Sequence, residues 1–137
     1  MNLDCNSGKC TLSKSSDSQE WKFENVNSNI YHIRNIKSNQ YLDSNFNGDV
    51  YTNPLYNNDF QKWIIELIYL NDLHEILGNT KGIFPKIGPV ILVNKKTGRL
   101  FDSDFNGRVY TLPPNSANFQ KYYLLPRDDY YFIASYE

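Results

Sequence analysis

The stretch YLDSNFNGDVYT at residues 41–52 decides the fold, because it occurs twice in the chain with few changes. It returns at residues 100–111 as LFDSDFNGRVYT. Each copy is followed by a closing tetrapeptide, FQKW at 60–63 and FQKY at 119–122. Because this order of letters recurs over more than twenty residues, the chain contains an internal repeat.

A third, degraded copy opens the chain. It reads LDCNSGKCTL at 3–12 and leads to QEW at 19–21, with two residues fewer between Gly8 and Gln19 than the other copies have in that interval. A unit this short cannot bury an apolar face alone, so three such units are expected to close against one another.

Within each repeat the letters predict strand, tight turn, strand, loop and strand. Asn47-Gly48 and Asn106-Gly107 are strong hairpin signals, because a two-residue type I′ turn needs a positive φ at both positions, which Asn and Gly tolerate. We therefore expect two-residue turns at both pairs.

A strand-like stretch follows each closing motif, and we expect it to open the next unit. These stretches begin at Tyr31, Leu73 and Tyr131. The last has no next unit, while the first unit lacks an opening strand, so Tyr131 to Ser135 is expected to complete the first unit. The prediction is one all-β domain over 1–137 that closes as a threefold ring, with units at about 1–23 plus 129–137, 24–67 and 68–126.

The third unit is longer than the second. The closing aromatics are 42 residues apart from Trp21 to Trp63 and 59 apart from Trp63 to Tyr122. An insertion of about seventeen residues is expected within 78–89, whose glycines and prolines exclude a helix.

Composition and charge exclude several function classes. The formal net charge is −1 and the basic residues are scattered, which disfavours nucleic acid and membrane surfaces as partners. No apolar run approaches the roughly 20 residues of a spanning helix, and the first residues lack the features of a signal peptide. Two cysteines and two histidines without metal-ligand spacing predict neither a metal nor another cofactor.

The two cysteines flank the first hairpin turn. Cys10 aligns with Val50 and Val109, which the alternation of the strand points inward. We expect Cys5 and Cys10 to be buried, inert thiols in preference to a hairpin-spanning disulfide.

Three units of about forty residues, each closed by Gln-x-Trp or Gln-x-Tyr, resemble the ricin B-type β-trefoil lectin domain. The motif Gly-x-Val-Tyr-Thr-x-Pro resembles more specifically a motif in the trefoil modules of insecticidal toxins of the mosquitocidal toxin and pierisin type. The resemblance implies a secreted or extracellular protein, galactose-type glycans as ligands, and a toxin catalytic or pore-forming partner. It also implies a structural role, with the aromatic in the core, for Gln19, Trp21, Gln61, Trp63, Gln120 and Tyr122.

In the family, an Asp just before the hairpin accepts sugar hydroxyls, and it maps onto Asp4, Asp43 and Asp102. The family's stacking aromatic is replaced by Asn53 and Leu112, and its amide by Phe60 and Phe119. Because Tyr51 and Tyr110 share the strand face of the missing aromatic, they are expected to replace it. The predicted carbohydrate-binding residues are Asp43, Tyr51, Asn53, Asp102 and Tyr110.

These residues favour a non-enzymatic glycan-binding module. The alternative is a protein-binding trefoil that uses its exposed tyrosines and the 78–89 loop. An enzyme is disfavoured because no Ser/His/Asp or Cys/His arrangement is present, and His32 and His74 are expected to be packed residues of matching strands.

Overall fold

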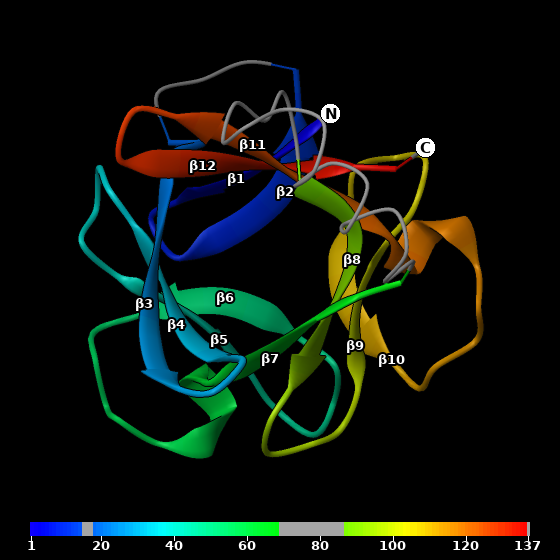
Figure 1. The fold of residues 1–137 in the computed structure, drawn as a ribbon, viewed down its shortest axis with the longest axis horizontal. Helices are drawn as coiled ribbons and strands as arrows, with labels where there is room; N and C mark the ends of the chain where they lie inside the picture. The colour runs from blue at the N-terminus through cyan, green and yellow to red at the C-terminus, as the bar shows by residue number, and fades with distance from the viewer. Residues whose placement is uncertain (15–17, 69–86, 137) are drawn as a thin grey trace.

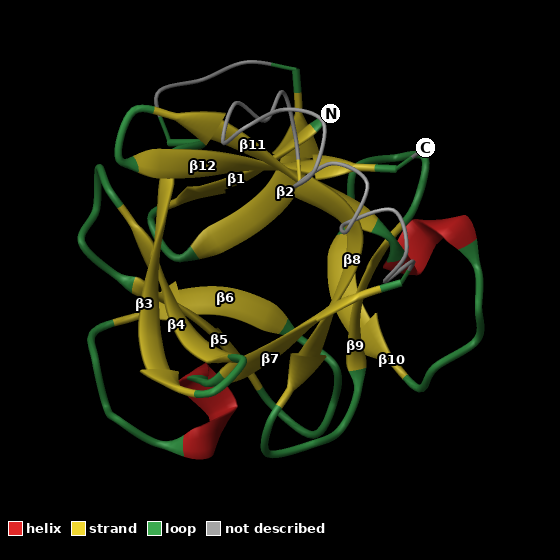
Figure 2. Ribbon diagram, in the orientation of Figure 1, coloured by secondary structure: helices red, strands yellow, loops and turns green. Residues whose placement is uncertain are grey.

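The computed structural model describes residues 1–14, 18–68 and 87–136. Two single-turn 3-10 helices, η1 (Asp59–Gln61) and η2 (Asn118–Gln120), accompany the strands (Figures 1 and 2). The strands are β1 (Asn2–Asn6), β2 (Lys9–Ser13), β3 (Trp21–Asn27), β4 (Ile30–Asn35), β5 (Tyr41–Ser44), β6 (Val50–Asn53), β7 (Trp63–Leu67), β8 (Ile87–Asn94), β9 (Leu100–Ser103), β10 (Val109–Leu112), β11 (Tyr122–Arg127) and β12 (Tyr130–Ser135).

The strands form a closed ring that carries three hairpins. β3, β4, β7, β8, β11 and β12 pair antiparallel in that order, and β12 returns to β3. The hairpins β1–β2, β5–β6 and β9–β10 attach to the ring through β12, β4 and β8. Each unit thus supplies two ring strands and one hairpin. The predicted all-β fold, a β-trefoil, is confirmed.

The core repeats the threefold pattern in layers of equivalent side chains. Because Asn35 and Asn94 face Trp21 and Trp63 in the strand register, the positions of the units can be matched one to one. Each of the following side chains is fully buried. One layer is Trp21, Trp63 and Tyr122, the next Leu3, Leu42 and Phe101, and the third Ile33, Leu92 and Ile133.

The first unit is completed by the end of the chain. β12 pairs with β1 at Asn2↔Ala134 and with β3 at Tyr131↔Trp21. The Ser135 amide donates to the Met1 carbonyl at 2.9 Å, so both ends of the chain lie on the same side of the molecule (Figure 1). The ring has no free edge at this point, which removes an aggregation-prone strand edge.

The third unit opens with a different strand from the one predicted. The stretch from Leu73 to Leu77 lies outside the described residues, and the strand that pairs with β7 and β11 is β8. Two residues join β3 to β4, whereas residues 68–86 join β7 to β8, so the insertion falls there. Gly88 and Pro89 belong to β8 and not to a loop. The residue that matches His32 is Ile91, so the expected equivalence with His74 is also wrong.

The expected two-residue turns at Asn47-Gly48 and Asn106-Gly107 are corrected to wider turns. Gly48 has a φ of 89°, but Asn47 is not among the residues with positive φ. Instead, the Gly48 amide donates to the Asn45 carbonyl at 3.2 Å, and the Asn45 side chain accepts from the Asn47 and Asp49 amides. The Asn45 side chain therefore substitutes for a backbone acceptor, which a dipeptide rule does not detect.

The first hairpin has the two-residue turn, and a disulfide braces it. Ser7 and Gly8 have φ values of 53° and 83°, as a type I′ turn requires. Cys5 and Cys10 are direct cross-strand partners and are joined at an S–S distance of 1.98 Å. The expectation of two free thiols is wrong, because the shorter turn places both side chains opposite each other.

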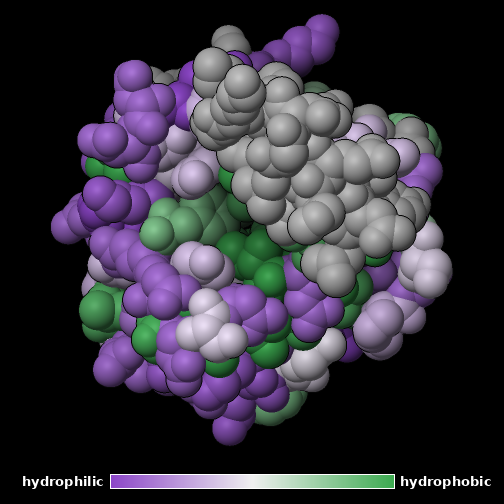
Figure 3. Space-filling model, in the orientation of Figure 1, coloured by the Kyte–Doolittle hydropathy of each residue, from purple (hydrophilic) through white to green (hydrophobic). Residues whose placement is uncertain are grey.

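An apolar hollow opens between the ring strands. Figure 3 shows hydrophobic side chains at the centre of this face. A cavity of about 320 Å³ is lined there by residues of all six ring strands. Phe23 forms edge-to-face contacts with Tyr31 and Tyr131, at centroid distances of 6.2 and 5.4 Å, which hold the rim together.

Candidate functional site

The second unit brings the predicted Asp43, Tyr51 and Asn53 together. Asp43 in β5 and Tyr51 in β6 are cross-strand partners. The Asp43 carboxylate is buried and accepts from the Ser44 amide at 2.8 Å and from the Asn53 Nδ2 at 3.1 Å. A third bond, also 3.1 Å, comes from the Gln61 Nε2. A carboxylate offers about four lone-pair sites, so one acceptor direction of Asp43 is left.

The glutamine of the closing motif orients this carboxylate. Gln61 Nε2 also donates to the Pro54 carbonyl at 2.8 Å, while its Oε1 accepts from the Tyr56 amide at 2.8 Å. The Trp63 indole donates to the Leu42 carbonyl at 3.1 Å. Gln61 therefore fixes the loop after β6, and Trp63 fixes the start of the β5–β6 hairpin. Asp43 is held between these two segments.

The third unit repeats the arrangement with one donor fewer. The Asp102 carboxylate accepts from the Ser103 amide at 2.8 Å and from the Gln120 Nε2 at 3.0 Å. Leu112 stands where the second unit has Asn53, and an aliphatic side chain has nothing to donate. About two acceptor directions of Asp102 therefore remain unused, against one for Asp43, although both carboxylates are buried.

The two predicted tyrosines differ in how their hydroxyls are used. The Tyr51 hydroxyl donates to the Ser44 carbonyl at 3.0 Å, whereas the Tyr110 hydroxyl has no hydrogen-bond partner in the described part of the chain. Both rings are half-buried. Burial first, and then the neighbouring Asp43 or Asp102 carboxylate, raises the pKa of each phenol, so both are neutral donors near neutral pH.

The first unit departs from the pattern. The Gln19 amide donates to the Ser13 carbonyl and hydroxyl and not to Asp4, and the Ser13 hydroxyl donates to Asp4 at 2.8 Å. Thr11, which is exposed, stands at the position of Tyr51. This unit lacks the aromatic neighbour of the carboxylate and is the weakest candidate.

Two phenylalanine pairs, each with one exposed and one half-buried ring, lie in the second and third units and were not predicted as site residues. The Phe46 and Phe60 rings meet edge to face at 5.3 Å, and the Phe105 and Phe119 rings do so at 4.7 Å. Phe46 is 63% exposed and Phe105 is 77% exposed, so each pair presents one aromatic ring to solvent at a hairpin tip. The signal in the sequence is the Phe that both long repeats place inside a polar turn.

The described residues contain no group of three or more His, Cys, Asp or Glu side chains that could hold a metal ion. Over the same residues, no helix is long and apolar enough to cross a membrane. The chemistry that the site can perform is hydrogen bonding by carboxylate, amide and phenol next to aromatic rings.

Comparison with known proteins supports the fold and no more. No family model matches the chain. A designed threefold symmetric protein, ThreeFoil, superposes with a TM-score of 0.63 at 17% identity, covering 87% of this chain and 86% of its own. A GH43 β-1,3-galactosidase superposes with a TM-score of 0.65 at 17% identity over 93% of this chain, which corresponds to 25% of the enzyme's chain. The fold is therefore that of threefold β-trefoil proteins.

Proposed function

We propose that the chain is a non-enzymatic carbohydrate-binding module of the ricin B-type lectin class, with one site in the second unit and one in the third. The observation that carries the proposal is the repeated arrangement in which a motif glutamine holds a buried aspartate beside a half-buried tyrosine. Sugar hydroxyls need acceptors held in fixed directions, and sugar C–H faces need an aromatic surface.

The third unit is the stronger of the two proposed sites. Asp102 retains more acceptor capacity than Asp43, the Tyr110 hydroxyl is free to bond to a ligand, and Phe105 offers the most exposed aromatic surface of the described residues. One shallow sugar site gives a dissociation constant of about 1 mM, so useful binding needs both sites to engage one multivalent surface.

The biological role that we propose is glycan targeting, in which the module directs a toxin catalytic or pore-forming partner to cells. This proposal is supported by the Gly-x-Val-Tyr-Thr-x-Pro motif, which resembles the trefoil modules of insecticidal toxins. It places the protein outside the cell and makes galactose-type glycans the first ligands to test.

A protein-binding role is the second candidate, because the second unit exposes three large apolar side chains. Phe46, Leu55 and Tyr56 are 63%, 48% and 60% exposed. Aromatic anchors of this kind are enriched at protein interfaces. The loop at 78–89, which this role was expected to use, lies mostly outside the described residues.

Retention on galactose-coated agarose tests the proposed function. Asp102→Asn removes the charge and sets an amide donor against the Gln120 amide, and Tyr110→Ala removes the neighbouring ring. Each should weaken binding by about tenfold or more. The matched control is Tyr136→Ala, which removes an exposed aromatic ring packed on Tyr123, outside the Asp/Tyr arrangement. The Asp43→Asn/Asp102→Asn variant should not be retained.

The proposal would be contradicted if this double variant, with an unchanged near-ultraviolet circular dichroism spectrum, were retained as well as the unmodified chain. Because the Asp substitutions remove buried hydrogen bonds, Tyr110→Ala and Phe105→Ala give the same test at positions where the fold has less to lose. Unchanged retention in both would equally contradict it.

A further inference from the structure

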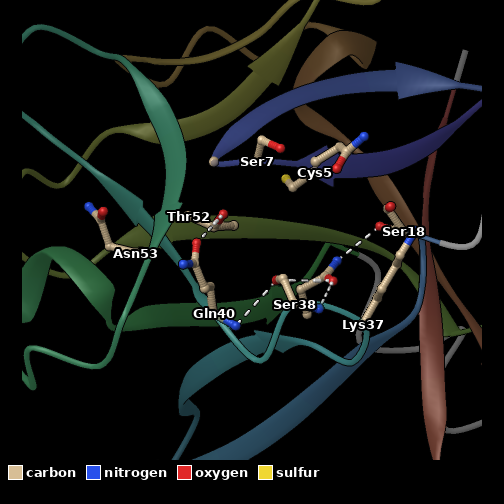
Figure 4. Close-up of a pocket in the computed structure, with 11 residues that line it drawn as sticks. Cys5, Ser7, Ser18, Lys37, Ser38, Gln40, Thr52 and Asn53 are labelled. Atoms are coloured by element: carbon tan, nitrogen blue, oxygen red, sulfur yellow. Dashed lines mark hydrogen bonds between the residues drawn. The ribbon is translucent and has the colours of Figure 1, made fainter.

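A further cavity lies at the seam between the first and second units, next to the Asp43 arrangement. It has a volume of about 580 Å³ and a polar lining. Figure 4 shows Ser7 and Cys5 entering it from the first hairpin, Ser38 and Gln40 from the turn after β4, and Thr52 from β6. The size is within the range of small-molecule sites in proteins.

The matching seam between the second and third units shows why this cavity is open. At each seam a hairpin glycine carbonyl accepts from a threonine amide, Gly8 from Thr52 at 3.3 Å and Gly48 from Thr111 at 2.8 Å. At the second seam Arg99 fills the space. Its Nη2 donates to the Thr111 carbonyl at 2.6 Å, and its Nε donates to the Thr111 Oγ1 at 3.1 Å.

Gln40 occupies the position that corresponds to Arg99. The Asn35 amide donates to the Gln40 carbonyl at 2.8 Å, as the Asn94 amide donates to the Arg99 carbonyl at 2.9 Å. The shorter Gln40 side chain stops at the Thr52 hydroxyl, from which its Oε1 accepts at 3.2 Å. The cavity at the first seam is therefore the space that an arginine fills at the second.

The floor of the cavity is preorganised. Asn35 is fully buried, and its Nδ2 donates to the Ser18 carbonyl at 2.9 Å while its Oδ1 accepts from the Ser38 amide at 3.1 Å. The disulfide of Cys5 fixes the hairpin that forms the opposite wall. A site with its walls fixed loses little conformational entropy when a ligand binds.

The cavity is lined by one cationic residue, Lys37, and by neutral groups of both hydrogen-bonding kinds. Gln40 Nε2 is a donor without a partner in the described residues, and the Ser7 hydroxyl can both donate and accept. The Asn53 side chain points to Asp43 on the other side of β6 and away from the other lining side chains (Figure 4). No carboxylate lines the cavity. A hydroxyl both donates and accepts, so adjacent ligand hydroxyls match this lining better than a cation or an apolar group.

We propose that this seam cavity is a further carbohydrate site that binds one neutral sugar residue through the Gln40 amide and the hydroxyl of the hairpin Ser7. Asn53 of the Asp43 arrangement borders this cavity, but the two sites use different surfaces. The proposal rests on the proposed function only for the class of ligand.

The test is a titration of the ¹⁵N-labelled full chain with methyl β-galactoside and, separately, methyl α-mannoside, followed by amide chemical shifts. With at least one probe we expect saturable shifts at Gly8, Ser38 and the Gln40 side-chain amide, with a dissociation constant in the millimolar range. Gln40→Arg copies the second seam and should abolish these shifts. Gln40→Leu removes the donor without filling the cavity and should weaken binding at least tenfold.

Arg99→Gln is the matched control, because it should keep the response at Gly8 and Ser38 and create a new one at Gly48. Shifts confined to the Ser44 and Ser103 amides would overturn the seam site while supporting the proposed Asp/Tyr sites. Shifts confined to the seam would do the reverse. Seam shifts that persist in Gln40→Arg, or no shift with either probe at either place, would overturn the seam proposal.

Discussion

Single residues of the closing motif act on both stability and the proposed site. Trp21 and Trp63 each donate from the indole to the carbonyl at the start of a hairpin. Tyr122 replaces the indole with a hydroxyl that bonds to the Phe119 carbonyl and to Ser103, each at 2.8 Å. Burial raises the pKa of the Tyr122 phenol well above its usual range, so it stays protonated in the core.

Trp63→Ala should destabilise the fold by about 3–5 kcal/mol, because it removes a large buried aromatic and leaves a cavity in a layer shared by all three units. Trp63→Phe should be much milder, since it keeps most of the packing against Phe101. Urea unfolding measures both. A stable Trp63→Ala that fails only to bind sugar would mean that Trp63 belongs to the binding surface.

His32 predicts a pH dependence. Its Nε2 is buried without a partner among the described residues, and the ring packs edge to face on Tyr41 at 5.6 Å. Burial first, and Lys62 second, lower the pKa of His32, against a smaller opposing effect of Glu24. The unfolded chain therefore binds more protons below about pH 6.5, and stability that is complete above that pH is lost as the pH falls toward the folded-state pKa.

His32→Phe keeps an aromatic ring at this position and cannot titrate. The fall in the urea midpoint from pH 7.5 to 5.5 should therefore be smaller in the variant than in the unmodified chain. An equal fall in both proteins would show that His32 is not responsible.

The hairpins show what a sequence can and cannot predict about an element. Their positions followed from the repeat, because Asn-Gly pairs mark turns. The turn type did not follow, since the Asn45 side chain accepts two backbone amides and widens the loop. The disulfide was missed because it depends on the register Cys5↔Cys10, which the one-residue shorter turn sets.

Gly48 joins the second hairpin to the third unit, and Gly98 is its matched control. Both have a positive φ, 89° and 71°. A Cβ on Gly48 would stand 2.7 Å from the Thr111 carbonyl oxygen, whereas a Cβ on Gly98 would meet nothing within 4 Å. Gly98→Ala should cost about 1–2 kcal/mol from backbone strain alone, and Gly48→Ala clearly more. Equal losses in thermal unfolding would contradict the seam packing.

At the level of the whole molecule, the repeat predicted a closed threefold ring, because only mutual closure buries three short apolar faces, and the resemblance to Gln-x-Trp domains identified the ring as a trefoil. The opening strand of the third unit was misplaced, because Leu73 to Leu77 and the observed strand β8 both have the apolar pattern of a strand. The site could be predicted only in part. The repeated Asp and Tyr could be predicted from the sequence. The Phe pairs could not, because they depend on how each hairpin tip packs against the closing loop. The Gln40 cavity could not either, because it depends on which side chain fills the seam between two units.

Ring closure predicts that truncation after Pro126 destabilises the fold by several kcal/mol, because β12 covers Trp21 and pairs with β1, β3 and β11. Thermal melting of the truncated chain measures the loss. A melting temperature within a few degrees of that of the full chain would contradict the closure.

The most direct test of a carbohydrate-binding role is a glycan array probed with the unmodified chain, with and without free sugar as competitor. We expect reproducible binding to a restricted set of glycans, with galactose-terminated ones among them, that free sugar abolishes and that the Asp43→Asn/Asp102→Asn variant lacks. Absence of any competed signal, with the chain folded, would contradict carbohydrate binding and favour the protein-binding surface around Phe46, Leu55 and Tyr56.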